Sequence, residues 1–426
     1  MKYFSFSFSL FIICVSLFIL HPYTIYGKPG MLIAGILVAY GLYHGVNREF
    51  ARLFLLPTAV LFMIGVIGMV SSFFNDIFQF NHLLAIVSFI VIISAAYGLW
   101  IYCQRNGISV NEMLVVVLLV IVFNSVIIIL ELNFDSFRQF IESFLDPFKG
   151  GGINYASGYR LRGVSSAGGA GLSISIPVAL TIALHLFDRK ILPFYLFIPI
   201  AAILLFSILV IGRTGLVLSV LPFTIYMILL LKRGRVIFLL TIWLTLPLLL
   251  RLLYQFTTGY FTDMFGENFI MYAIGFLLEG SEGIEKERTI GYIIDFLKVL
   301  PLEFPQAFVG YGFYGGSAFV PWTDSGFARM FMSVGFVFGL IFYMLIYRVY
   351  FLAFKSNEFL IGVMILLLTV AEIKEPLLFS GVASRIFITV LVFFWLEKYS
   401  LLKRNGKGCG LLLNSDGRSR TPSSSS

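Results

Sequence analysis

Long hydrophobic segments follow one another along almost the whole chain and are separated by short polar stretches. An α-helix needs about 20 residues to cross a bilayer, and runs of that order recur from end to end. We predict about 12 transmembrane helices, at residues 4–20, 30–46, 53–74, 83–103, 112–133, 171–187, 191–211, 214–231, 236–252, 327–347, 359–373 and 386–402. The alternation over roughly ten residues that marks a transmembrane strand does not recur, so the predicted fold class is an all-α polytopic membrane protein.

Two connections break this regular spacing, residues 134–170 and 254–326. The first is rich in glycine. The second contains the stretch EGIEKERTIGYIIDFLKVL, which has apolar residues on one helical face and would lie along the membrane surface. We expect both loops to be ordered, because they carry aromatic and periodic apolar residues. Residues 1–403 then form a single membrane domain, and residues 404–426 form a low-complexity tail that we expect to be disordered.

Composition supports the membrane assignment. Hydrophobic residues make up 59% of the 426 residues and charged residues only 12%, which leaves too few polar side chains to cover a soluble domain. The net charge of +8 does not indicate a nucleic-acid partner, because the basic residues gather in alternate short loops such as NREFAR and KRGR. By the positive-inside rule, this pattern places both termini in the cytoplasm and both long loops on the outer side of the membrane.

Several kinds of chemistry are excluded by what the sequence lacks. The three cysteines, Cys14, Cys103 and Cys409, do not form a disulfide or metal-binding pattern. The four histidines lie outside both long loops, so we expect neither a metal centre nor a histidine-activated nucleophile there. A GxxxxGK[ST] phosphate-binding loop is missing, which argues against an ATP-driven pump. The transmembrane segments do not show the chain of acids expected of a proton relay. We therefore predict that the protein needs no cofactor and no metal.

Arginines on the predicted outer side are unusual, since orientation does not require them. They are Arg160, Arg162, Arg213, Arg288, Arg329 and Arg385. Each could be an interfacial residue whose apolar stem lies in lipid while its charged head reaches water. Arg213 is the hardest to explain in this way, because it stands in a two-residue connection between two spans. A guanidinium binds phosphate through a two-pronged fork and keeps its charge, so converging arginines would suit a pyrophosphate-linked lipid.

Asp324 places a carboxylate at the head of the tenth predicted span. One interpretation is that Asp324 is the N-cap of that helix, which would begin near Phe327. A second role is compatible with the first. An acid at the boundary between water and lipid, facing arginines, could deprotonate or orient a sugar hydroxyl.

Several short stretches, in this order and on this side of the membrane, resemble the O-antigen ligase and polymerase superfamily of bacterial envelopes. They are YRLRGVSSAGGAG before the sixth span, IGRTG after the seventh, ERTIGYIIDFL and VGYGFYGG in the large loop, and DSGFARMFMSVGFVFGL at the tenth span. The layout of nearly the whole chain is also similar. The ligases of this superfamily carry a histidine at the head of the tenth helix, followed by a glycine. Here the glycine is Gly335 and the head position is Asp324, which favours a Wzy-type O-antigen polymerase.

The resemblance implies a GT-C-like helical glycosyltransferase in the bacterial inner membrane. Such a polymerase moves a growing glycan from undecaprenyl pyrophosphate to the sugar of another lipid-linked repeat unit, without a nucleotide sugar or a metal. Asp324 and Arg288 would then be catalytic, and Arg160, Arg162, Arg213 and Arg329 would bind the pyrophosphate. The partners implied are undecaprenyl-pyrophosphate-linked glycans and membrane lipids, and a protein that regulates chain length is left open.

Three other functions stay open. An O-antigen ligase would join the glycan to the lipid A core, although the histidine is missing. A lipid-linked oligosaccharide flippase or another transporter would carry charges near the middle of the membrane and often has repeated halves, and neither feature is found. A structural or partner-binding membrane protein is disfavoured only by the placement of the arginines.

Overall fold

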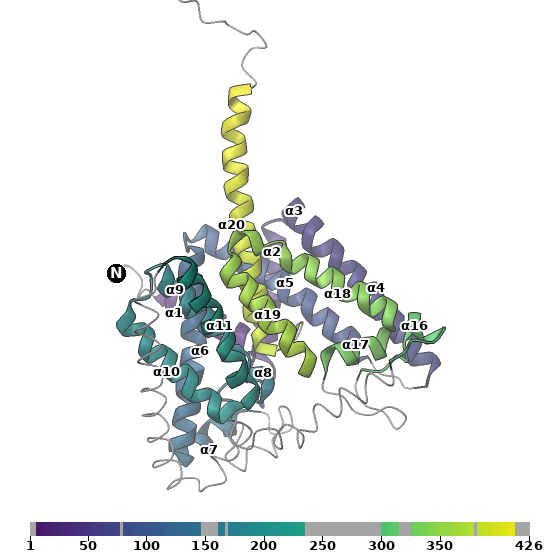
Figure 1. Ribbon diagram of the computed structural model, residues 1–426, viewed down its shortest axis with the longest axis horizontal. Helices are drawn as coiled ribbons and strands as arrows, with labels where there is room; N and C mark the ends of the chain where they lie inside the picture. Colours follow the sequence, from purple (N-terminus) through teal and green to yellow (C-terminus); the bar gives the residue numbers. More distant parts are fainter. Residues whose placement is uncertain are drawn as a thin grey trace, which may run out of the picture.

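The computed structural model describes residues 6–76, 80–145, 161–166, 169–234, 300–314, 325–378 and 381–413. Within these residues the fold contains no extended strand and is built almost entirely from helices (Figure 1). The helices are α1 (Phe6–Leu20), α2 (Pro29–Tyr43), α3 (Arg48–Phe50), the π-helix η1 (Ala51–Leu55), α4 (Leu56–Phe74), α5 (Asn81–Arg105), α6 (Val110–Asn133), α7 (Asp135–Phe144), α8 (Ala170–Ser173), α9 (Ser175–Asp188), α10 (Phe194–Ile211), α11 (Arg213–Lys232), α16 (Gln306–Val309), α17 (Gly326–Val334), α18 (Phe336–Phe351), the 3-10 helix η3 (Phe354–Ser356), α19 (Glu358–Lys374) and α20 (Gly381–Leu413).

Seven helices in the described segments are long and apolar enough to cross a membrane. They are Ala51–Phe74, Asn81–Arg105, Val110–Asn133, Gly171–Asp188, Phe194–Ile211, Thr214–Lys232 and Phe336–Ser356. The protein is therefore a helical, multi-pass membrane protein, as its sequence predicts. Helices also occupy the other predicted spans that fall within the described residues, whereas the span predicted at 236–252 lies outside them. The total of twelve spans and the cytoplasmic placement of the termini stay predictions.

The helices pack around two central elements. α5 contacts α2, α4 and α20, and α9 contacts α6, α10, α11 and α19. Small residues allow the closest of these approaches. A Cβ atom on Gly98 of α5 would overlap the carbonyl oxygen of Leu37 in α2, and Gly41 faces Gly98 across the same contact. Close contact between small residues is a common way for helices to associate in a membrane, where lipid is as apolar as the side chains.

The tenth predicted span, 327–347, is two helices rather than one. α17 ends at Val334 and α18 begins at Phe336, and between them Gly335 has a positive φ of 87°. A side chain at Gly335 would also collide with the backbone of Phe308, because the turn before Gly310 packs into the break. The prediction of one continuous helix was wrong here, since only glycine combines this backbone conformation with so close a neighbour.

α20 continues beyond residue 403, where the membrane domain was predicted to end, and reaches Leu413. Extending an existing helix adds one hydrogen bond for each residue fixed, so a helix can run past the end of its apolar stretch. The remainder of the predicted tail lies outside the described residues. This extension marks one end of the bundle (Figure 1). α7 and α8 lie toward the opposite end. We call it the outer end, because α7 belongs to the loop predicted to lie outside the cytoplasm and α8 begins at the last residue of that loop.

Candidate functional site

A buried acid occupies the last turn of α19. Glu372 has no exposed surface. Its carboxylate accepts a hydrogen bond from the Tyr343 hydroxyl at 3.0 Å, and from the backbone N–H groups of Leu377 and Leu378 at 2.6 and 2.8 Å. The Tyr350 hydroxyl donates to the Leu378 carbonyl oxygen at 2.5 Å, which holds the same turn from its other side. A carboxylate is costly to bury, and these donors offset that cost.

The start of α17 lies directly against this acid. A Cβ atom on Gly326 would overlap Oε1 of Glu372, so only glycine fits at this position. The N-cap of α17 is Ser325, whose hydroxyl accepts a hydrogen bond from the backbone N–H of Ala328 at 3.4 Å. The expectation that Asp324 is the N-cap was therefore wrong, because the neighbouring serine takes that position. Asp324 itself lies outside the described residues.

Arg329 joins this region one turn into α17. It is half-buried, and its guanidinium carbon lies 6.0 Å from the ring centre of Tyr314. Burial raises the pKa of the Tyr314 hydroxyl well above its usual value, and the negative charge of Glu372 raises it further, so this hydroxyl stays protonated. We refer to Tyr314, Arg329, Tyr343 and Glu372 as the Glu372 cluster.

An apolar groove of about 440 Å³ lies close to the cluster, between α4 and the turn at 305–310. Its walls include Val70 and Phe74 of α4, whose exposed fractions are 44% and 79%, so the groove opens where lipid would surround the helix. The Ser71 hydroxyl donates to the Gly310 carbonyl oxygen at 3.1 Å and fastens the two walls together.

The short segment 310–314 connects the groove with the cluster. Its backbone N–H groups at Tyr311 and Gly312 donate to the carbonyl oxygens of Met332 and Ser333, at 2.8 and 3.2 Å, so it runs beside α17. Gly310 lines the groove and Tyr314 belongs to the Glu372 cluster. An apolar surface open to lipid and a charged, hydrogen-bonding surface are thus neighbours.

Arg162, predicted to bind pyrophosphate, is fully buried in an ion pair. Its Nη2 and Nε atoms lie 2.7 and 3.3 Å from the two carboxylate oxygens of Glu142 in α7. The side chain of Arg162 has no exposed surface, whereas that of Glu142 is 28% exposed. This geometry is the fork-to-carboxylate pairing that guanidinium groups favour, and here it joins α7 to the bundle.

The residues that follow Arg162 are anchored in α6 by a second buried acid. Glu131, only 1% exposed, accepts a hydrogen bond from the Gly163 backbone N–H at 3.2 Å. Asn124 accepts from the Val164 backbone N–H at 2.9 Å. Our sequence analysis did not identify Glu131 or Glu372. Each lies in the last turn of a predicted apolar span, just before the charges that follow it, and this position inside the span boundary is the signal that could have identified both as buried polar anchors.

The connection that carries Arg213 packs beside this anchored loop. α11 begins at Arg213, and the backbone N–H of Gly215 donates to the Ser173 hydroxyl of α8 at 3.2 Å. A Cβ atom on Gly171 of α8 would in turn touch the Leu377 side chain at 3.6 Å. The start of α11, α8 and the turn after Glu372 therefore lie in sequence along the outer end, which brings the backbone of Arg213 to the same end as Arg329.

The remaining candidate residues divide into two groups. Arg160 and Arg288 lie outside the described residues. Arg385 is buried in α20, where it donates to the Phe18 carbonyl oxygen at 2.7 Å and lies over the Phe18 ring. In the described segments, no three His, Cys, Asp or Glu side chains gather closely enough to hold a metal ion.

Comparison with known proteins identifies no relative of this chain. No protein-family model matches the chain, and neither a curated protein nor a solved structure matches it. What the arrangement can do chemically is therefore argued from its residues. It offers a half-buried guanidinium beside a buried acid and two tyrosines, next to an apolar groove that faces lipid.

Proposed function

We propose that this protein is an O-antigen polymerase, which joins oligosaccharide repeat units carried on undecaprenyl pyrophosphate at the outer face of the bacterial inner membrane. The observation that carries this proposal is the adjacency of the Glu372 cluster and the lipid-facing groove. A lipid-linked glycan is polar at one end and apolar at the other. A protein that acts on it needs a polar surface and an apolar surface side by side, and the segment 310–314 supplies that junction.

In this proposal Arg329 contacts the pyrophosphate of the donor, and the first isoprenoid units lie along the groove between α4 and the 305–310 turn. A guanidinium gives two parallel hydrogen bonds to phosphate oxygens and keeps its charge at any physiological pH. Arg213 and Arg160 would complete the pyrophosphate site from the neighbouring connections. Arg162 contributes indirectly, since its pair with Glu142 fixes the loop that leads to α8.

The reaction transfers a glycan between two oxygens. A hydroxyl of the acceptor sugar attacks the anomeric carbon of the donor, and the bond from that carbon to the pyrophosphate oxygen breaks. The Asp324 carboxylate takes the proton of the attacking hydroxyl. Arg288 and Arg329 stabilise the negative charge that grows on the departing pyrophosphate, which is where fixed positive groups contribute most to catalysis.

Deletion of the gene in its own strain, followed by a lipopolysaccharide gel, tests the activity. We expect the ladder of long chains to collapse to caps of a single repeat unit, because attachment of the first unit does not require polymerisation. Complete loss of attached O-glycan would instead indicate a ligase or a flippase. An unchanged ladder would remove the enzyme proposal altogether.

Complementation with an Arg329→Lys variant tests the role of the cluster. We expect a loss of activity of about a hundredfold, the usual cost of removing one hydrogen-bonded contact to developing charge. The matched control is Arg138→Lys, since Arg138 forms a surface pair with Asp135 at 3.0 Å on α7. Equal ladders from the two variants at equal protein levels would exclude Arg329 from the pyrophosphate site.

A further inference from the structure

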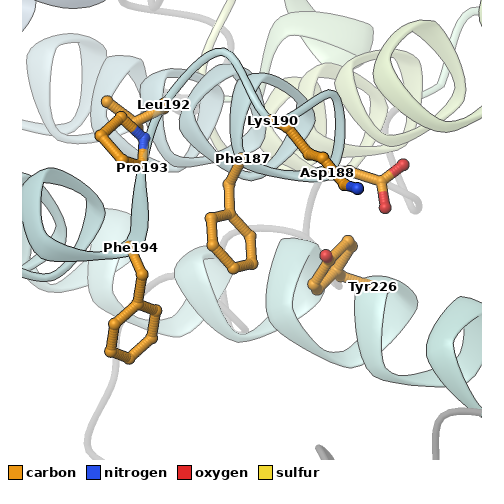
Figure 2. Close-up of a pocket in the computed structure, with 7 residues that line it drawn as sticks. All are labelled: Phe187, Asp188, Lys190, Leu192, Pro193, Phe194 and Tyr226. Carbon is orange, nitrogen blue, oxygen red and sulfur yellow. The ribbon is translucent and has the colours of Figure 1, made fainter.

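A second cavity lies at the end of the bundle away from the Glu372 cluster, between the α9–α10 connection and α11. Its volume is about 420 Å³, within the range of roughly 300–1,000 Å³ that small-ligand sites occupy. Figure 2 shows its lining. The lining residues are Phe187, Asp188, Lys190, Leu192, Pro193, Phe194 and Tyr226.

The floor of this cavity is aromatic. The Phe187 ring stacks on Phe197 with centres 5.0 Å apart, and it meets Phe194 at 6.2 Å. Tyr226 of α11 closes the other side and is itself buried. Phe194 is 58% exposed and its neighbour Tyr195 is 74% exposed, so the aromatic floor continues onto the lipid-facing side of α10. Exposed aromatic rings of membrane proteins are enriched at the boundary between acyl chains and headgroups.

Basic residues stand on and beside the segments that line the cavity, and Lys190 itself belongs to the lining. Arg189 and Lys190 are exposed in the α9–α10 connection, and Lys232 and Arg233 are exposed at the end of α11. The lining contains one carboxylate, Asp188, which accepts a hydrogen bond from Nη1 of Arg233 at 2.6 Å. Because that pair is neutral as a unit, the net positive charge of these five residues comes from Arg189, Lys190 and Lys232.

We propose that this cavity is a binding site for an anionic phospholipid. Part of one acyl chain lies on the aromatic floor, and the headgroup phosphate lies at Lys190 within the field of Arg189 and Lys232. Charge complementarity selects an anionic lipid over a neutral one, and the opening toward lipid selects a membrane lipid over a soluble ligand. Basic pockets between helices on the cytoplasmic side of a membrane recognise anionic headgroups by this chemistry.

The proposal is independent of the polymerase activity, because the cavity lies at the opposite ends of α9 and α11 from Ser173 and Gly215. The basic residues here also serve the orientation of the chain, but orientation requires only their charge. A lipid site requires both the charge and the aromatic floor, so substitutions of a cation and of an aromatic residue test the proposal separately.

The test is native mass spectrometry of the purified full-length chain with added phosphatidylglycerol, phosphatidylcholine or inorganic phosphate. Lys190 has a positive φ of 59°, a conformation that asparagine adopts more easily than most residues, so Lys190→Asn removes the cation without straining the turn. We expect about a fivefold loss of phosphatidylglycerol affinity, the effect of one cation near an anionic headgroup. Phe194→Ala should also weaken binding, whereas Arg105→Gln, an exposed cation at the end of α5, should not.

Three outcomes would overturn the proposal. Lys190→Asn and Arg105→Gln could bind phosphatidylglycerol equally well. Phosphatidylcholine could bind as tightly as phosphatidylglycerol, which would leave the cations without a role in selection. Inorganic phosphate alone could bind with the same dependence on Lys190 and no dependence on Phe194, which would make the cavity an anion site without a lipid.

Discussion

Replacing Glu372 separates what its carboxylate does for the fold from what its charge does for chemistry. Glu372→Ala removes the acceptor of two backbone N–H groups, at Leu377 and Leu378, and of the Tyr343 hydroxyl. Glu372→Gln keeps the shape. Its carbonyl oxygen can accept from both N–H groups, and its amide can donate to the Tyr343 oxygen.

The structure sets the size of the difference. A buried donor that loses its acceptor costs about 1–3 kcal/mol, and two buried N–H groups are left behind in the alanine variant. We count only these two, since the Tyr343 hydroxyl can rotate, and expect a loss of roughly 2–6 kcal/mol in the free energy of unfolding. The glutamine variant should remain within about 1 kcal/mol of the native protein, because both backbone N–H groups keep an acceptor and the Tyr343 oxygen accepts from the new amide.

The assay is thermal unfolding of the detergent-solubilised protein, followed by fluorescence-detected size exclusion. We expect the alanine variant to melt several degrees below the native protein and the glutamine variant to melt close to it. Asp135→Ala is the matched control, because its surface pair with Arg138 should contribute less than about 1 kcal/mol. An alanine variant that melts with the native protein would show that Glu372 does not hold the turn. A stable glutamine variant without activity would assign a chemical role to its charge.

Three further perturbations have defined outcomes. Glu142→Gln should lower the melting temperature more than Arg162→Gln. The first replaces the carboxylate that pairs with a fully buried guanidinium, whereas the second leaves a partly exposed carboxylate. Equal shifts measured by thermal unfolding would contradict this. Burial lowers the pKa of His21 to about 3, and the nearby charges of Arg385 and Lys28 act in the same direction. The folded protein therefore disfavours the His21 cation, so stability is complete above the unfolded pKa of about 6.5 and is lost as pH falls from there toward 3. His21→Asn, which suits the positive φ of this position, should flatten the decline of melting temperature between pH 7 and 5, and parallel curves would refute the argument. Arg213→Lys should leave membrane insertion unchanged but shorten the O-glycan ladder, because lysine lacks the two-pronged fork, whereas a normal ladder would identify Arg213 as an interfacial anchor.

The helices were predictable from sequence because apolar length is nearly sufficient to specify a transmembrane helix. The break at Gly335 was not, because its cause is the turn of residues 307–310 packed against it, and that turn is distant along the chain. Gly98 of α5, by contrast, allows close packing without breaking its helix. The sequence does not distinguish a glycine that breaks a helix from one that allows close packing, because the two differ only in backbone conformation and in the segment packed against them.

The candidate site was predictable only in part. Reading outer-side arginines as one class was too coarse, because Arg329 is half-buried beside Tyr314, whereas Arg162 is fully buried against Glu142. An arginine can be buried where a carboxylate pairs with it, as Glu142 pairs with Arg162. The sequence alone does not show that residues 142 and 162 lie close together. The acid that organises the cluster, Glu372, was overlooked because it stands among the charges that end a span and resembles an ordinary surface residue.

The contact between Arg385 and Phe18 has a consequence for how the chain is made. In a continuing helix the Phe18 carbonyl oxygen would accept from the backbone N–H of residue 22, but that residue is a proline and has none. The Leu20 carbonyl oxygen accepts instead from the Ser166 backbone N–H at 3.1 Å. The end of the first helix is thus completed by residues synthesised much later, the last of them 367 positions away. Until Arg385 is synthesised, the Phe18 carbonyl oxygen lacks this donor. The hydrogen bonding at the end of α1 is therefore completed only after most of the chain has been synthesised.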